Sequence, residues 1–291
     1  MTPIADSELI INPDGSVFHL HIKPEELAHR IILVGDPGRV AMVGGFFDEV
    51  LHQGSNREFV WKTGVFNKIM FTVLSTGIGT DNIDIVLNEL DALVNIDFET
   101  RFKKEEHTTL QIVRIGTSGS LQQDLPVDSW LLSKKAIGFD GLLNFYDRRY
   151  EVSDLPFEEA FVEHTGWLKN LPAPYVVNAN NNLIKELSGS KVIAGVTISA
   201  PGFYGPQGRV LRLPLALPQL NEKISSFKYQ GQIITNFEME CSAIYGLSAL
   251  LGHKAATVCV IIANRWQGTY SKNYKQVVED LVEYVLKKLS K

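Results

Sequence analysis

The sequence predicts an α/β fold in which helices cover a central sheet within a single domain. Continuous apolar runs, which are typical of strands buried on both faces, recur along the chain. Segments with apolar residues at helical spacing lie between and after these runs. No linker rich in Pro, Gly or Ser and no internal repeat divides the 291 residues. We therefore expect one domain over residues 1–291.

The expected elements follow one another along the chain. The apolar runs that we expect to form strands are Arg30–Val34, Lys68–Ser75, Gln111–Ile115, Lys191–Ser199, Gln232–Thr235 and Thr257–Ala263. The amphipathic segments that we expect to form helices are Asp81–Val94, Met239–Leu251 and Tyr274–Leu289. Gly252 would end the second helix, and lysines near the end of the third suit the negative end of its dipole. The charged segment Asp97–Thr109 is expected to be a solvated surface insertion.

Composition excludes several classes of protein. A formal net charge of -5 argues against a protein that coats nucleic acid, which needs a dense basic face. Met1–Asn12 carries two acids and no Lys or Arg, unlike a secretory signal, and the apolar run Ala255–Ala263 is too short to span a membrane. Cys241 and Cys259 lack the spacing of a metal or redox motif, so we expect two buried thiols. A cytoplasmic enzyme is the prediction.

Three glycine-rich turns follow predicted strands. They are V-G-D-P-G-R at Val34–Arg39, S-T-G-I-G at Ser75–Gly79 and I-G-T-S-G-S at Ile115–Ser120. Exposed backbone N–H groups in such turns suit an anion, and ligands collect at the carboxyl ends of strands in α/β sheets. None of the turns is a P-loop or a complete G-x-G-x-x-G motif. Each one alone is equally typical of a plain strand-to-helix turn.

Arginines flank two of these turns and favour a phosphate site. Arg39 ends the first turn, and Arg114 precedes the third from within an apolar strand. An unpaired guanidinium there would be unfavourable, while its planar fork matches phosphate. A structural ion pair is the alternative for Arg114.

Two further motifs suit a nucleoside. In F-Y-G-P-Q-G-R, Gln207 can donate and accept hydrogen bonds at once, which fits the edge of a pyrimidine, and Arg209 can donate to carbonyl oxygens. A surface loop is the alternative. In N-F-E-M-E, the Glu240 carboxylate can accept from two ribose hydroxyls. The alternative is that these acids only stabilise a helix start.

Together these motifs identify a resemblance. G-D-P-x-R, S-T-G-I-G, R-I-G-T-S-G, F-Y-x-x-Q-x-R and E-M-E occur in the order found in the uridine phosphorylase branch of the nucleoside phosphorylase family, which the chain resembles from Val17 to the C-terminal helix. The resemblance implies a three-layer α/β/α fold with a central mixed sheet. It also implies phosphorolysis of uridine or related pyrimidine nucleosides in pyrimidine salvage, with phosphate as co-substrate and no cofactor. A homodimer or a trimer of dimers with shared active sites is implied as well.

The resemblance assigns residues to three subsites. The implied phosphate-binding residues are Gly35, Arg39, Arg57, Arg114 and Thr117, with Arg57 coming from a neighbouring subunit. The implied ribose-binding residues are His19, Met239 and Glu240, with His19 reaching the ribose 5′-hydroxyl across the interface. The implied base-binding residues are Phe203, Gln207, Arg209 and Arg265. The residues implied to be catalytic are Arg39, Arg114, Glu240, Gln207 and Arg209.

Two departures and two alternatives accompany the resemblance. Some relatives bind a monovalent cation near the position of Glu58, but Asn82 replaces a nearby serine, and Val210–Leu213 is more apolar than usual. One alternative is a purine nucleoside phosphorylase or nucleosidase of the same fold. The purine enzymes place an aspartate late in the chain, where Ala263–Arg265 has no acid. The other alternative is a non-catalytic nucleoside-binding protein, which would not need the two phosphate arginines.

Overall fold

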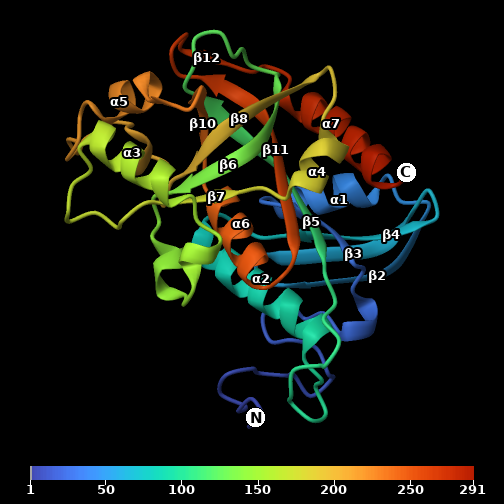
Figure 1. Ribbon diagram of the computed structural model, residues 1–291. Coiled ribbons are helices and arrows are strands. Elements are labelled where there is room, and N and C mark those ends of the chain that lie inside the picture. The colour runs from blue at the N-terminus through green and yellow to red at the C-terminus, as the bar shows by residue number, and fades with distance from the viewer. Residues whose placement is uncertain (1) are drawn as a thin grey trace.

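The computed structural model describes residues 2–291 and has a mixed sheet flanked by helices (Figure 1). The strands are β1 (Arg30–Val34), β2 (Glu49–Asn56), β3 (Phe59–Phe66), β4 (Ile69–Ser75), β5 (Gln111–Ser120), β6 (Trp130–Gly138), β7 (Tyr175–Asn178), β8 (Val192–Ser199), β9 (Lys228–Tyr229), β10 (Gln232–Glu238), β11 (Lys254–Asn264) and β12 (Thr269–Tyr270). The α-helices are α1 (Pro37–Gly44), α2 (Thr80–Asn95), α3 (Leu155–Thr165), α4 (Asn181–Leu187), α5 (Leu220–Ser226), α6 (Cys241–Leu250) and α7 (Tyr274–Leu289).

The sheet has two parts that share β5. On one side, β1 pairs in parallel with both β5 and β4, and β3 and β2 continue as an antiparallel meander. On the other side, β5 pairs with β11 and β10, and β6 and β8 complete a closed ring of five strands. Strand β5 therefore joins the open part of the sheet to the closed part.

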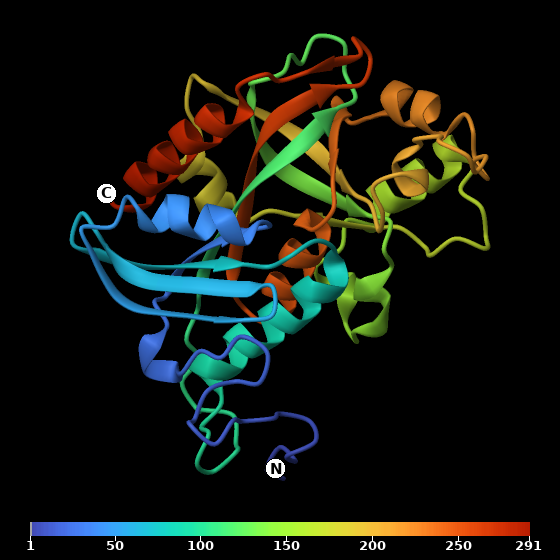
Figure 2. The ribbon, with the colours of Figure 1, turned by 180° about the vertical axis from the view of Figure 1, so that it is seen from behind.

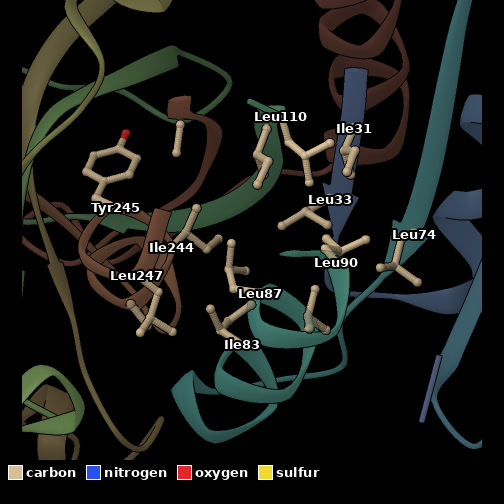
Figure 3. Packing of buried hydrophobic residues seen from close by; sticks show 14 of the residues in the cluster. Ile31, Leu33, Leu74, Ile83, Leu87, Leu90, Leu110, Ile244, Tyr245 and Leu247 are labelled. Carbon is tan, nitrogen blue, oxygen red and sulfur yellow. The ribbon is translucent and has the colours of Figure 1, made fainter. Parts of the chain in front are cut away.

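Alternating side chains of β1 supply two cores, one on each face of the sheet. Ile31 and Leu33 pack in the cluster shared with α2 and α6, which Figure 3 shows from close by. Ile32 and Val34 pack in the cluster shared with α1, α4 and α7. The two views in Figures 1 and 2 show these helix groups on opposite sides of the sheet. The three-layer α/β/α fold with a central mixed sheet is confirmed.

All of the predicted strands and helices are present; β1 and α7 have the predicted ends, and the others begin or end at different residues. Strand β5 continues to Ser120, five residues beyond the predicted end, and helix α6 begins at Cys241 rather than at Met239. Strand β2 was not predicted because it is mostly exposed and has no apolar run. Strand β6 was not predicted because Lys134 and Lys135 interrupt its apolar run; the Lys135 ammonium is buried and forms an ion pair with the partly exposed Asp154.

The charged segment Asp97–Thr109 is only partly the solvated insertion that was predicted. Most of its charged side chains are exposed. The side chain of Arg101, however, donates hydrogen bonds to the backbone carbonyls of Ile4, Ala5 and Leu9. Arg101 thereby fastens the N-terminal segment to the loop that follows α2, so part of the segment is structural.

Both cysteines are buried free thiols, as predicted. Burial raises the pKa of Cys259 to about 12 and that of Cys241 well above its ordinary value. Neither thiol is therefore a nucleophile near neutral pH. In residues 2–291, no helix is long and apolar enough to cross a membrane.

Candidate active site

The candidate site forms where the parallel strands β1 and β4 end beside the middle of β5. Val34 at the end of β1 pairs with Ser75 at the end of β4, and Leu33 pairs with Arg114 of β5. The predicted turns at Val34–Arg39 and Ser75–Gly79 therefore open at the same edge of the sheet, whereas Ile115–Ser120, which was predicted to be a turn, continues strand β5. Ligands collect at this edge in α/β folds.

Arg114 points from β5 toward the start of α6. Side chains alternate along a strand, and Ile112, two residues earlier, packs in the α2–α6 core. The buried guanidinium lies over Gly116, where an added Cβ would come within 2.0 Å of Nη1. Nη2 donates to the Glu240 carboxylate, and Nη1 lies 3.3 Å from Glu238. A glycine at position 116 is thus a condition for this placement of the charge.

The two glutamates of the E-M-E motif have different tasks. Glu238 accepts from the backbone N–H groups of Glu240 and Cys241 at 2.9 and 3.0 Å and from the Ser199 hydroxyl at 2.5 Å. It therefore satisfies the donors at the start of α6. Glu240 makes no such cap, and its Oε1 accepts from the Gly79 N–H at 2.8 Å. The helix-start interpretation thus applies to Glu238, and Glu240 remains available for a ligand.

Charge in this cluster is not fully balanced. One guanidinium, that of Arg114, faces two buried carboxylates. Burial and the neighbouring Glu240 raise the pKa of Glu238 to about 7, although Arg114 opposes the rise. Attraction to both glutamates outweighs burial and raises the pKa of Arg114 above its ordinary value. The cluster therefore retains a proton on Glu238 up to near-neutral pH.

Arg39 has no protein partner in the part of the chain that the structure describes. Its half-buried side chain forms neither a hydrogen bond nor an ion pair within residues 2–291. Burial and the nearby positive charge of Arg114 both lower its pKa. The Asp36 carboxylate opposes this shift but forms no ion pair with Arg39, and two neighbouring guanidiniums favour a bound anion. Gly35 precedes Arg39 in the same turn, and Thr117 lies half-buried on β5.

The F-Y-x-x-Q-x-R motif forms a loop that begins beside this cluster. The Ala200 N–H donates to the backbone carbonyl of Glu238 at 2.9 Å, so the loop leaves β8 next to the E-M-E motif. Gln207 is buried, and the Arg209 guanidinium donates to its Oε1 at 2.5 Å. The same guanidinium stacks 3.8 Å from the centre of the Phe203 ring. A carboxamide, a cation and an aromatic face are thus gathered as predicted.

Arg265 supports this loop from the end of β11. Its guanidinium donates to the backbone carbonyls of Gln207 and Gly208. Burial and the positive charge of Arg265 lower the pKa of Arg209 to about 10. The side-chain amide of Asn264 donates hydrogen bonds to the backbone carbonyls of Gln122 and Leu125, at 3.0 and 2.8 Å. Asn264 is therefore a structural residue and not a proton donor.

The remaining residues implied by the resemblance lie in two places. Met239 is half-buried between Glu238 and Glu240. Arg57 is exposed in the turn between β2 and β3, and among residues 2–291 it contacts no carboxylate. His19 lies in the N-terminal segment, bonded to Glu89. The structure thus gathers the other implied residues near the strand ends and leaves Arg57 and His19 outside them.

The groups that could hold a metal are already engaged. Asn82 donates to Glu58 Oε1 at 3.1 Å, so the carboxylate that the resemblance associates with a cation already has a protein partner. Elsewhere, ligand atoms of Asp91, His107 and His253 lie within 4.8 Å of one another. The Nδ1 atom of His253 accepts the Leu110 N–H at 3.2 Å, so the proton of the neutral ring is on Nε2, which faces Asp91. His253 is therefore a poor metal ligand.

Sequence reasoning missed two residues that shape the site. Glu238 was noted beside Glu240, but its bonds to the start of α6 and to Arg114 were not anticipated. The E-x-E spacing beside a buried arginine was the available signal. Gly116 was taken for a turn residue, whereas it makes room for Arg114 within β5. No local pattern distinguishes these two uses of glycine.

The chain matches known proteins over nearly its whole length. Residues 29–290 match the phosphorylase superfamily. A uridine phosphorylase of Thermococcus kodakarensis is 28% identical over 267 residues, which cover 89% of this chain and 81% of that protein. A DeoD-type purine nucleoside phosphorylase of Streptococcus suis is 25% identical over 275 residues, which cover 93% and 98%. A solved Trypanosoma brucei nucleoside phosphorylase, described as showing uridine phosphorylase activity, is 31% identical, with 97% and 99% coverage and a TM-score of 0.88.

Proposed function

The chain belongs to the phosphorylase superfamily, and from this premise we propose that it cleaves uridine with inorganic phosphate to uracil and ribose 1-phosphate. One observation carries the phosphorolytic part of the proposal. The Arg39 guanidinium is half-buried near Arg114 and has no carboxylate partner within residues 2–291. Water as the nucleophile would need neither charge, whereas a phosphate dianion is matched by both.

The reaction then depends on positioning and on electrostatics. Arg39, Arg114, the turn at Gly35 and Thr117 of β5 hold phosphate for attack on C1′ of the ribose. Glu240 uses one oxygen for Gly79 and the other for Arg114, and a carboxylate has about four acceptor sites, so two ribose hydroxyls can still donate to it. Its negative charge favours the positive charge that develops on the ribose as the bond to the base breaks.

The base side of the proposal rests on Gln207 and Arg209. The buried carboxamide of Gln207 can donate to and accept from a pyrimidine edge, and Arg209 can stabilise negative charge on the departing base. Phe203 supplies an aromatic face, and Arg265 holds the loop through its carbonyls. Asn264, whose side-chain amide is bonded to backbone carbonyls, cannot act as the acid that would protonate a departing purine. A pyrimidine nucleoside is therefore favoured over a purine nucleoside.

We also propose that two subunits share each site. Arg57 is exposed in its turn, and His19 faces Glu89, so neither completes the site of its own chain. Exposed apolar side chains, Ile78 at 70% and Phe145 at 88%, provide surface that a second copy would bury. We propose a homodimer or a trimer of such dimers, acting in cytoplasmic pyrimidine salvage without a cofactor.

A direct assay tests the proposed reaction. Loss of ultraviolet absorbance reports cleavage of uridine, and phosphate is titrated into a buffer that otherwise lacks it. We expect the rate to rise from near zero and saturate with phosphate. Arg39→Ala should raise the phosphate concentration needed for half-saturation, because it removes a charge-assisted contact. Uracil release that is equally fast without phosphate would replace the proposal with hydrolysis.

A further inference from the structure

His19 is held by one buried carboxylate at three points. Glu89, on helix α2, is 9% exposed. Its Oε2 accepts the Leu20 N–H at 2.9 Å, and its carboxylate oxygens accept the His19 N–H at 3.1 Å. The Nδ1 atom of His19 lies 2.5 Å from Oε1. Both the backbone and the ring of His19 are therefore fixed by Glu89.

This contact also sets which ring nitrogen carries the proton. An ionised carboxylate can only accept, so the hydrogen bond requires a proton on Nδ1. In the neutral ring, Nε2 is then an acceptor. The His19 side chain is 30% exposed, and within residues 2–291 its Nε2 has no partner. Within residues 2–291, Nε2 of the neutral ring is thus a hydrogen-bond acceptor that can bind a donor from outside the subunit.

A second contact links His19 to the exposed arginine. The side-chain amide of Asn56 donates to the His19 carbonyl at 2.9 Å. Asn56 ends β2, and the next residue, Arg57, has a positive φ of 54° in the turn to β3. This hydrogen bond therefore places the backbone of His19 beside the turn that carries Arg57.

We infer that Glu89 is a positioning residue that aims His19 Nε2 at the ribose 5′-hydroxyl bound in the neighbouring subunit's site. The inference rests on the proposed function. Carboxylates that fix a histidine tautomer and ring orientation act in the same way behind metal-bound histidines. Asn56 couples this presentation to Arg57, so one subunit supplies a ribose contact and a phosphate contact together.

The test compares uridine with 5′-deoxyuridine, which lacks the 5′-hydroxyl. In Glu89→Gln, an NH₂ group replaces one carboxylate oxygen. This donor cannot accept hydrogen bonds from the N–H groups of His19 and Leu20. We expect kcat/KM for uridine to fall about tenfold or more, as for one lost hydrogen bond, and kcat/KM for 5′-deoxyuridine to change less than about twofold. His19→Ala should give the same pattern, and adding Glu89→Gln to it should cause no further loss.

Controls separate this role from general damage. Glu25→Gln removes an exposed acid from the same N-terminal segment and should leave both substrates unaffected. If Glu89→Gln does not fold, Glu89→Asp keeps the charge but shortens the reach, and it should show the same selective loss. Equal losses on both substrates in either variant would overturn the inference. Failure of the unmutated protein to cleave uridine would instead overturn the proposed function.

Discussion

The cluster proposed to bind phosphate and ribose and the loop proposed to bind the base are built in different ways. Arg114, Glu238 and Glu240 are at most 5% exposed and are held by strand ends and the start of α6. The loop after β8 has a single 3-10 turn at Gly205–Gln207, and Leu213 within it is 82% exposed. The first region is part of the core, and the second lies over it.

This difference places the residues proposed for the reaction and those proposed for choice of the base in separate parts of the molecule. Every nucleoside contains a pentose, and phosphate is the co-substrate whichever base is bound; the cluster proposed to bind both is built into the sheet, where strands fix the geometry. The base differs between nucleosides, and its readers lie on a loop that tolerates change. Changes in the cluster should therefore reduce cleavage of every nucleoside, while changes in the loop should alter which nucleoside is cleaved.

The largest effect is expected from one methyl group in the cluster. In Gly116→Ala the new Cβ would meet the Arg114 guanidinium at 2.0 Å, so the arginine must move away from Glu240. We expect kcat/KM to fall roughly 100-fold or more, since more than one charge-assisted contact is lost. In an Arg114→Ala background the same methyl group should have little further effect. Additive losses in the double variant would show that Gly116 acts independently of Arg114.

A smaller loss is expected when a base reader is removed. Gln207→Ala deletes a buried hydrogen-bonding group, which costs about 1–3 kcal/mol, so uridine cleavage should fall roughly tenfold to a few hundredfold. Gln219→Ala, an exposed glutamine before α5, is the matched control and should be unaffected. Inosine should be a poor substrate of the unmutated protein. Inosine turnover that equals uridine turnover would contradict the base assignment.

The shared site can be tested by mixing subunits. Arg39→Ala and Arg57→Ala should each lose about 1.5–3 kcal/mol of transition-state stabilisation. When the two variants are unfolded and refolded together, half of the dimers are mixed, and each mixed dimer has one intact site. Activity should return to about a quarter of the unmutated value per subunit. If subunits demonstrably exchange and no activity returns, both arginines belong to a site within one chain.

The smallest effect concerns stability and pH. The folded protein raises the pKa of Glu238 from 4.5 to about 7, mainly by burial. Between these values the unfolded chain has released a proton that the fold retains, so stability should fall as pH rises through this window. Urea unfolding should show the protein losing on the order of 1–3 kcal/mol relative to Glu238→Gln between about pH 5 and pH 7. Parallel pH profiles would rule out this titration.

Buried elements could be predicted from the sequence more readily than exposed strands or long-range contacts. Buried strands such as β1 were found because burial on both faces leaves an apolar run. Arg114 was found because a charge inside such a run is conspicuous. Strand β2 was missed because its side chains are mostly exposed. The bond between Glu89 and His19 spans 70 residues, and no local pattern indicates a contact over that separation.

The sugar product shows whether Arg39 and Arg114 hold phosphate as the nucleophile. Uridine is incubated with the protein and phosphate, and uracil, ribose 1-phosphate and free ribose are quantified. We expect uracil and ribose 1-phosphate to form in equal amounts, with no free ribose and no uracil when phosphate is omitted. Free ribose formed in proportion to uracil would contradict this expectation, because water and not phosphate would then have attacked C1′.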